Sequence, residues 1–199
     1  MSLNNSLKPI GVLLAAGRGR RMGGGKQFYP WPTESGEKPL VAAAFDAVAS
    51  VCDAMIVVLG HRAAEVAAAL GERPFRAVQS DPDAPMFESI RVGIQAALET
   101  NPESTVLLQP GDHPEVQPAT LVQILIFSGK HPDRAIVPEF QGRGGHPVLI
   151  PAGIAQRLLT TDCPQGLGQY WSDHPELCLR LSVDDESVVR DVDTAARCN

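Results

Sequence analysis

Residues 10–26 read IGVLLAAGRGRRMGGGK, an apolar segment followed by a loop rich in glycine and arginine. Its first part, Ile10–Leu14, is short, apolar and rich in branched side chains, as is typical of a buried parallel strand. The small residues that follow allow backbone amides to approach a phosphate chain closely. Four of the chain's 17 lysines and arginines fall within residues 18–26. In a chain with a formal net charge of −6, this concentration of cations indicates an anion-binding loop.

The spacing within the loop differs from two common phosphate-binding motifs. A Walker A loop has a glycine six residues before its lysine and a Ser or Thr directly after it. Around Lys26 these positions hold Arg20 and Gln27, which excludes a P-loop. A dinucleotide-binding fingerprint counted from Gly17 needs a third glycine where Met22 stands, and an acidic residue about 20 residues further on. An NAD(P)-binding oxidoreductase is therefore the poorer interpretation.

Strand-like and helix-like segments alternate along the rest of the chain. Strands are expected at Ala54–Leu59, Thr105–Leu108 and Ala135–Val137, and helices at Leu40–Val51, Arg62–Leu70, 87–98 and 118–129. This alternation predicts right-handed crossovers and a three-layer α/β/α sandwich with a mostly parallel sheet. Ligands of such folds bind outside the carboxyl ends of the strands, so the segments after Leu14, Leu59 and Leu108 are expected to face one crevice. Two remaining segments are expected to be a polar loop, Pro30–Lys38, and a Gly-rich excursion from the sheet, Glu139–His146.

Length and composition limit the class of protein. The 199 residues predict a single domain, with residues 1–8 as a flexible segment or a cloning remnant outside it. The composition, 44% apolar and 20% charged, excludes disordered, collagenous and coiled-coil chains. The negative charge argues against nucleic acid as a partner, and no apolar stretch is long enough to span a membrane. Four widely spaced cysteines fit free thiols in a reducing compartment, so a cytoplasmic protein is expected.

Residues 14–26 resemble the Leu-Ala-Ala-Gly-x-x-x-Arg-Met-Gly-x-x-Lys signature of nucleotidyltransferases with the MobA-like fold. Lys26–Trp31, Gly36–Leu40 and Ser89–Gly93 resemble further motifs of the molybdenum cofactor cytidylyltransferases, in the same order. The resemblance implies a Rossmann-like nucleotidyltransferase fold. It also implies a set of nucleotide-binding residues: Leu14, Ala15, Ala16, Gly17, Gly19, Arg21, Met22, Gly23, Lys26, Ser89 and Gly111.

Two acidic motifs resemble the family's metal site. Asp112 lies in a Gly-Asp-His-Pro segment that is similar to the family's Gly-Asp-Met/Gln-Pro, whose aspartate holds catalytic Mg²⁺. Asp193 lies in a segment similar to Asp-Ile-Asp-Thr and is the expected second ligand, with Asp191 as the alternative. Mg²⁺ usually takes only one or two protein carboxylates beside phosphate and water oxygens. The implied catalytic residues are therefore Arg21 on the triphosphate, Lys26 on the developing charge, and the metal ligands Asp112 and Asp193.

The acceptor side of the site is implied by residues 142–149, which resemble the family's Arg-Gly-His-Pro-Val segment. Gly145 and His146 are the expected substrate-binding residues there, with His146 donating to a substrate phosphate or, alternatively, serving only as a turn residue before Pro147. The chain departs from the family after Thr194 and within 162–170, which bears on the acceptor, and at 86–88, which bears on the base.

The function that the resemblance implies is transfer of CMP from CTP to the phosphate of molybdopterin bearing molybdenum, with release of pyrophosphate. The cofactor is Mg²⁺, and a molybdoenzyme or its chaperone is a further expected partner. CTP is preferred over GTP in this interpretation, because the guanylyl enzymes resemble Leu-x-Gly-Gly where this chain has Ala16, whose methyl would narrow the slot for the base. The alternatives are a transferase of the same fold using GTP or a sugar-phosphate acceptor, and a degenerate domain that binds nucleotide or cofactor without turnover.

Overall fold

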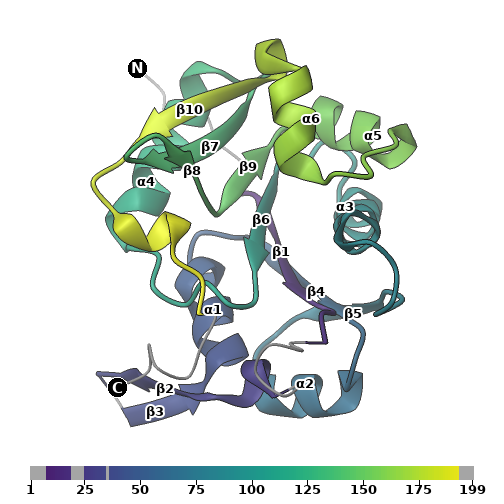
Figure 1. Cartoon of the computed structure of the whole chain (residues 1–199), viewed down its shortest axis with the longest axis vertical. Helices are drawn as coiled ribbons and strands as arrows, with labels where there is room; N and C mark the ends of the chain where they lie inside the picture. Colours follow the sequence, from purple (N-terminus) through teal and green to yellow (C-terminus); the bar gives the residue numbers. More distant parts are fainter. Residues whose placement is uncertain (1–7, 19–24, 35, 193–199) are drawn as a thin grey trace.

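The computed structural model describes residues 8–18, 25–34 and 36–192. A central sheet contains eight of the described strands: β1 Ile10–Ala15, β4 Ala54–Leu59, β5 Arg76–Gln79, β6 Val106–Pro110, β7 Ala135–Phe140, β8 Arg143–Gly144, β9 Val148–Ile150 and β10 Cys178–Ser182. Their order is β10-β7-β9-β6-β1-β4-β5, with β8 paired to β7 (Figure 1). The described helices are α1 Leu40–Ala49, α2 Ala63–Leu70, α3 Met86–Thr100, α4 Pro118–Lys130, α5 Ala152–Thr160 and α6 Leu167–Asp173. Short 3₁₀ turns are η2 Lys26–Phe28, η3 Pro175–Leu177 and η4 Glu186–Val189.

The sheet is mostly parallel, as the alternation of strands and helices predicts. β1 pairs in parallel with β4 on one side and with β6 on the other, and β10 pairs in parallel with β7. β9 is antiparallel to both of its neighbours, β6 and β7. The carboxyl ends of β1, β4 and β6 therefore meet at one edge of the sheet.

Helices cover both faces of the sheet, which confirms the three-layer sandwich (Figure 1). Successive residues of β1 show the division: Val12 belongs to the core cluster that includes residues of α3, α5 and α6, whereas Leu13 belongs to the cluster that includes residues of α1, α2 and α4. Both side chains are fully buried. Alternate residues of a strand face opposite sides, so a strand buried on both faces reads as the continuous apolar run seen in the sequence.

The segment expected to be a polar loop, Pro30–Lys38, instead forms most of a hairpin. Its strands are β2 (Pro30–Thr33) and β3 (Gly36–Pro39), paired antiparallel outside the main sheet. Trp31 is the reason that the hairpin folds back onto the protein, because its buried side chain packs with Leu40 and Val192. No helix in the described part of the chain is long and apolar enough to cross a membrane.

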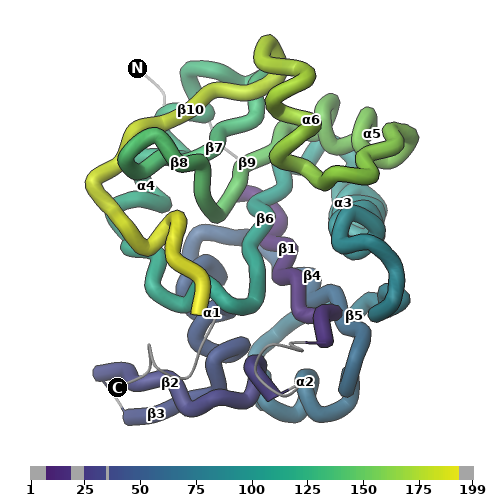
Figure 2. The backbone as a smooth tube through the Cα atoms, viewed as in Figure 1, coloured from purple at the N-terminus to yellow at the C-terminus, as the bar shows by residue number. Residues whose placement is uncertain are grey.

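The chain after β10 turns back toward the carboxyl edge of β6 (Figure 2). Asp185 fastens this return: its buried carboxylate accepts hydrogen bonds from the Gln117 amide (3.1 Å), the Thr120 hydroxyl (2.7 Å) and the Ser187 amide (3.0 Å). Burial alone would raise the pKa of Asp185, but these hydrogen bonds lower it below its ordinary value. The carboxylate thus joins the start of α4 to η4.

Candidate active site

The end of β1 lies between the ends of β4 and β6 and is hydrogen-bonded to the residues that follow both strands. The amide of Gly111, after β6, donates to the carbonyl of Leu14 at 2.9 Å, and the amide of His61, after β4, donates to the carbonyl of Ala16 at 3.1 Å. A Cβ atom at Gly111 would lie 2.9 Å from the Leu14 oxygen, and one at Gly60 would lie 2.7 Å from the Ala16 oxygen. Only glycine permits this close approach, so backbone packing fixes the end of β1 and the start of the loop at Ala16.

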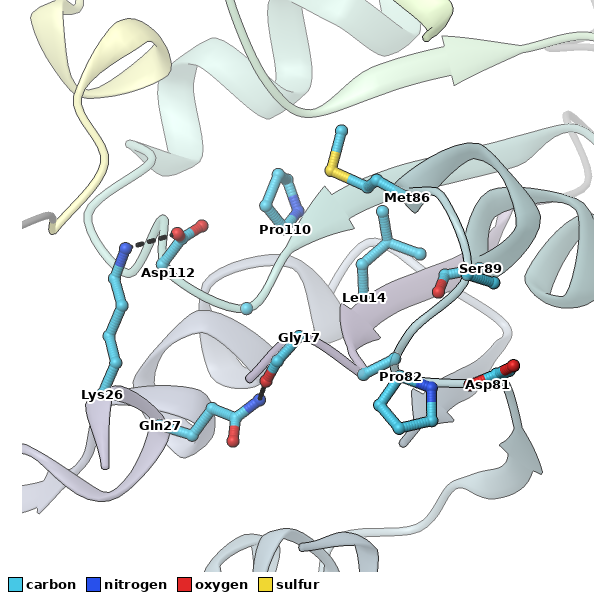
Figure 3. A pocket seen from close by; sticks show the side chains of 13 residues that line it. Leu14, Gly17, Lys26, Gln27, Asp81, Pro82, Met86, Ser89, Pro110 and Asp112 are labelled. Atoms are coloured by element: carbon cyan, nitrogen blue, oxygen red, sulfur yellow. Dashed lines mark hydrogen bonds and ion pairs between the residues drawn. The ribbon is translucent and has the colours of Figure 1, made fainter. Parts of the chain in front are cut away.

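The other side of the loop is held by Gln27 in η2. Its side-chain amide donates to the carbonyl of Ala15 at 2.8 Å and to that of Gly17 at 3.2 Å (Figure 3). Gln27 stands where a P-loop has its metal-binding hydroxyl, and here it fastens the loop to the strand instead. The described part of the phosphate-loop candidate is thus anchored by both backbone and side chain.

A cavity of about 310 Å³ opens at this edge of the sheet, and we call it the strand-end cavity. It is lined by Leu14, Ala16, Gly17, Lys26, Gln27, Asp81, Pro82, Ala84, Met86, Ser89, Pro110, Gly111 and Asp112 (Figure 3). Its volume is at the lower end of the range for small-molecule sites. Exposed Met86 and partly buried Leu14 provide apolar surface, and an ion pair between Arg18 and Asp83, with Nε and Oδ1 2.8 Å apart, connects the loop to the segment before α3.

Lys26 and Asp112 meet at one end of the strand-end cavity. The Lys26 ammonium lies 2.7 Å from Oδ2 of Asp112, and the two side chains are 13% and 31% exposed. A carboxylate that holds an ammonium group at the end of a parallel strand has the charge and position to hold a divalent cation that bridges phosphates. No group of three or more metal-ligating side chains occurs among the described residues.

A buried polar layer lies behind Asp112, and sequence reasoning missed most of it. The side-chain amide of buried Gln109 donates to the carbonyl of His113 at 2.6 Å, closing the turn that presents Asp112. The ring of His113 packs edge-on against that of His146, with centroids 5.3 Å apart. Burial lowers the pKa of His146 to about 4; it also lowers the pKa of His113, against the opposing charges of Asp112 and Asp191. Both rings are therefore neutral at pH 7.

The structure brings seven of the predicted site residues together around the strand-end cavity: Leu14, Ala16, Gly17, Lys26, Ser89, Gly111 and Asp112. Ala15 is the last residue of β1, and its methyl packs into the core on the opposite face. Gly145 and His146 lie instead against η4, where the His146 amide donates to the Val188 carbonyl at 2.7 Å. Gly19, Arg21, Met22, Gly23 and Asp193 lie outside the described residues. Asp191 is described and lies on the segment whose next residue, Val192, donates its amide to the Asp112 carbonyl at 3.1 Å.

The fold and the site together define a class of protein. A doubly covered parallel sheet carries, beyond its strand ends, a loop of small residues, a lysine and a carboxylate, as nucleotide-binding transferases do. The chain belongs to the MobA-like NTP transferase domain family, whose sequence profile matches residues 11–177. This confirms the resemblance that the loop signature indicates.

Individual relatives extend the comparison over nearly the whole chain. The chain is 30% identical to nicotine blue oxidoreductase from Paenarthrobacter nicotinovorans, covering 92% of this chain and 91% of that protein. Its structure is similar to that of Rv0371c from Mycobacterium tuberculosis H37Rv, with a TM-score of 0.79, 27% identity and 95% coverage of both chains. A manganese complex of Rv0371c gives a TM-score of 0.71 at 26% identity, covering 94% of each chain. A nucleotidyl transferase from Methanothermobacter thermautotroptrophicus gives a TM-score of 0.77 at 25% identity, covering 94% of this chain and 92% of that one.

Proposed function

We propose that the protein transfers CMP from CTP to the phosphate of a molybdopterin-type cofactor and releases pyrophosphate. The observation that carries this proposal is the strand-end cavity, where Lys26 and Asp112 meet beside a loop with the nucleotidyltransferase signature. The proposed metal is Mg²⁺, held by Asp112 and Asp193. The manganese complex of Rv0371c supports a divalent cation in this family.

The reaction is an in-line displacement at the α-phosphorus. An oxygen of the acceptor phosphate forms the new P–O bond, while the bond to the β-phosphate breaks and pyrophosphate leaves with the electron pair. The acceptor phosphate is already an anion, so the protein needs no general base. A bound Mg²⁺ supplies charge neutralisation at the phosphates and orients them.

The chain's own residues position the reactants and balance charge. The loop after β1 holds the triphosphate with its amides and with Arg21, and Lys26 meets the negative charge that grows on the α-phosphate and the leaving group. Lys26 reaches this place from η2, and its side chain already lies within the strand-end cavity. Asp112 and Asp193 provide the carboxylates for the metal.

The proposed preference for CTP rests on the lining of the strand-end cavity. Met86 and Ser89, in the first turn of α3, line the cavity, and so does Pro82 in the segment before this helix (Figure 3). Ala16 lines the same space and is 4% exposed. The methyl of Ala16 narrows the space left for a base, and this is the proposed reason for a preference for the smaller pyrimidine.

A second candidate function is favoured by one specific observation, the similarity to nicotine blue oxidoreductase. In that case the strand-end cavity would hold a nicotinamide nucleotide and the chain would carry out a reduction. Two further alternatives remain. One is a transferase of the same fold that uses GTP or a sugar-phosphate acceptor, and the other is a domain that binds nucleotide or cofactor without turnover.

The test is pyrophosphate release from each nucleoside triphosphate with Mg²⁺, in the presence and absence of molybdenum cofactor. The proposal expects release with CTP that depends on the cofactor, together with thermal stabilisation by CTP and Mg²⁺ of about 2.7 kcal/mol at 100 times Kd. Pyrophosphate release with GTP as the donor, or with a sugar phosphate as the acceptor, would show that the proposed substrates are wrong. Absence of release combined with consumption of NAD(P)H in the presence of nicotine blue would favour the oxidoreductase.

A further inference from the structure

Gln109 is the only polar residue in β6, and its side chain is completely buried. The strand reads Val-Leu-Leu-Gln-Pro and lies in the interior of the sheet, between β9 and β1. Leu107 and Leu108 pack into the cores on the two faces, so Gln109 shares the face of Leu107. An amide gives up its hydration on burial and recovers the free energy only through hydrogen bonds. Packing alone therefore does not account for a glutamine at this position.

The hydrogen bonds of the Gln109 side chain are incomplete, and the one that the structure describes reaches across a turn. The side-chain nitrogen donates to the carbonyl of His113 at 2.6 Å, whereas Oε1 is buried and accepts no hydrogen bond from any described residue. An amide with one polar atom unpaired contributes little to stability. The main effect of Gln109 is therefore on the turn, residues 111–113, which follows β6 and contains Asp112.

The backbone around Asp112 is held by its neighbours on both sides. The amide of Gly111 donates to the end of β1 at 2.9 Å, and the carbonyl of Asp112 accepts from the amide of Val192 at 3.1 Å. The bond from Gln109 to the His113 carbonyl adds the restraint that follows Asp112 in the chain. Together these bonds fix the direction in which the Asp112 side chain leaves the backbone, and with it the place where the carboxylate enters the strand-end cavity.

We infer that Gln109 is a positioning residue for the Asp112 carboxylate. Gln109 does not line the strand-end cavity, so it acts through the turn and touches no ligand. The inference rests on the proposed function in one respect, which is that Asp112 binds a divalent cation. Groups that hydrogen-bond behind a metal ligand commonly change metal affinity about 10- to 100-fold when they are removed. The loss of the Gln109 amide should therefore weaken cation binding while the carboxylate itself remains.

The test measures Mn²⁺ binding by electron paramagnetic resonance of the full chain, with CTP, with GTP and without nucleotide. Gln109→Met keeps the length of the side chain and removes the amide, and Gln109→Asn keeps an amide that is one carbon too short to reach the turn. Each should weaken Mn²⁺ binding about tenfold or more. Leu107→Ala, on the same strand and face, is the control, because it opens a cavity in the core and leaves the turn hydrogen-bonded. In urea, its unfolding midpoint should lie at or below those of the Gln109 variants, while its Mn²⁺ affinity stays that of wild type.

Wild-type Mn²⁺ affinity in both Gln109 variants would overturn the inference, and so would an equal loss in Leu107→Ala or the absence of Mn²⁺ binding by wild type under all three conditions. A second readout is the Mg²⁺ dependence of pyrophosphate release: excess Mg²⁺ should restore the rate in Gln109→Met, which keeps the carboxylate, but not in Asp112→Asn. The proposed function is judged separately. Mn²⁺ binding that depends on Gln109 without pyrophosphate release retains the positioning residue and rejects the transferase. Transfer with wild-type Mg²⁺ dependence in Gln109→Met retains the transferase and rejects the positioning residue.

Discussion

The two cavities on either side of Asp112 are built in different ways. The strand-end cavity rests on backbone: the ends of β1, β4 and β6 are pressed together so closely that Gly60 and Gly111 cannot carry a side chain without a clash. The η4 cavity, a second cavity of about 440 Å³ beside the β2–β3 hairpin, β8 and η4, is walled by side chains on short strands, loops and a 3₁₀ turn. The difference divides the molecule into a cavity whose shape is fixed by backbone packing and a cavity whose shape is fixed by the side chains of irregular segments.

The largest effect is expected at the residue between the cavities. Asp112→Asn keeps the size of the side chain but removes the charge for the metal, and it should lower kcat roughly 10³-fold or more, the scale of several kcal/mol of lost charge stabilisation. The measurement is CTP-dependent pyrophosphate release, with Asp133→Asn in an exposed turn as the control. Equal turnover in Asp112→Asn and wild type would remove Asp112 from the metal site.

Asp193→Asn should behave like Asp112→Asn if the second metal ligand is assigned correctly. The informative partner is Asp191→Asn, because Asp191 lines the η4 cavity two residues earlier. Titration of the rate with Mg²⁺ in both variants separates the two roles. A raised Mg²⁺ requirement in Asp191→Asn, with Asp193→Asn unaffected, would show that Asp191 is the second metal ligand in place of Asp193.

Lys26→Ala tests whether the strand-end cavity acts on the transition state. Charge grows on the α-phosphate and on the leaving pyrophosphate as the bond breaks, so kcat should fall roughly 10²–10³-fold, as when one oxyanion-stabilising donor is removed. Steady-state kinetics with CTP, with exposed Lys130→Ala as the control, gives the answer. A higher KM at unchanged kcat would make Lys26 a simple binding residue.

Asp185→Asn tests the stability of the segment around η4 separately from ligand binding, because Asp185 anchors η4 but lines neither cavity. Loss of hydrogen bonds to a buried charge should lower the free energy of unfolding by about 2–3 kcal/mol at pH 7. The pKa of Asp185 is lower in the folded chain than its ordinary value near 3.9, so its stabilisation is present above pH 4 and is lost as the pH falls through the folded-state pKa.

Urea unfolding of wild type and Asp185→Asn between pH 7 and pH 3 measures that loss. The difference between the two proteins should shrink below about pH 4. CTP should stabilise the variant as much as it stabilises wild type, because Asp185 does not line the strand-end cavity. A difference that stays constant with pH would show that the Asp185 carboxylate does not stabilise the fold through its charge.

The smallest effect is expected at Ala16. The preference for CTP over GTP should be roughly 10 to 200-fold in kcat/KM, the scale of a steric misfit, and Ala16→Gly should reduce it. A Cβ atom at Gly60 would lie 2.9 Å from the methyl carbon of Ala16. This methyl therefore lies next to the end of β4 and forms the back wall of the proposed slot for the base. Ala15→Gly, whose methyl packs on the other face, is the matched control. GTP used as well as CTP by wild type would reject the assignment.

The sequence predicts the strand-end cavity far better than the η4 cavity, and the reason is physical. Strands β1 and β4 are buried on both faces and therefore appear as uninterrupted apolar runs, and the residues just beyond them must meet at one edge. The β2–β3 hairpin was missed because Pro30 and Pro32 suggest a loop. β9 and β10 are short, and each lies next to the helical or irregular segments that the pattern left unassigned.

No periodicity or motif in the sequence predicts which residues line the η4 cavity. Arg143, Glu186 and Arg190 look like ordinary surface charges in the sequence, and only the return of the chain after β10 brings them together. Gln109 and His113 show the same limit inside the protein, because a buried polar residue in a strand or turn cannot be told from an exposed one by spacing. Their burial emerges only from the packing of β9 and η4 against β6 and β7.

The ion pair between Lys26 and Asp112 also has a consequence for the order in which ligands arrive. While the ammonium rests on it, the carboxylate is electrically satisfied and exerts little attraction on a free divalent cation. A triphosphate would offer Lys26 a more highly charged partner and would leave the Asp112 carboxylate open to the cation that the nucleotide carries. If Asp112 holds the metal as proposed, metal and nucleotide would bind as one complex, and the free metal would bind weakly.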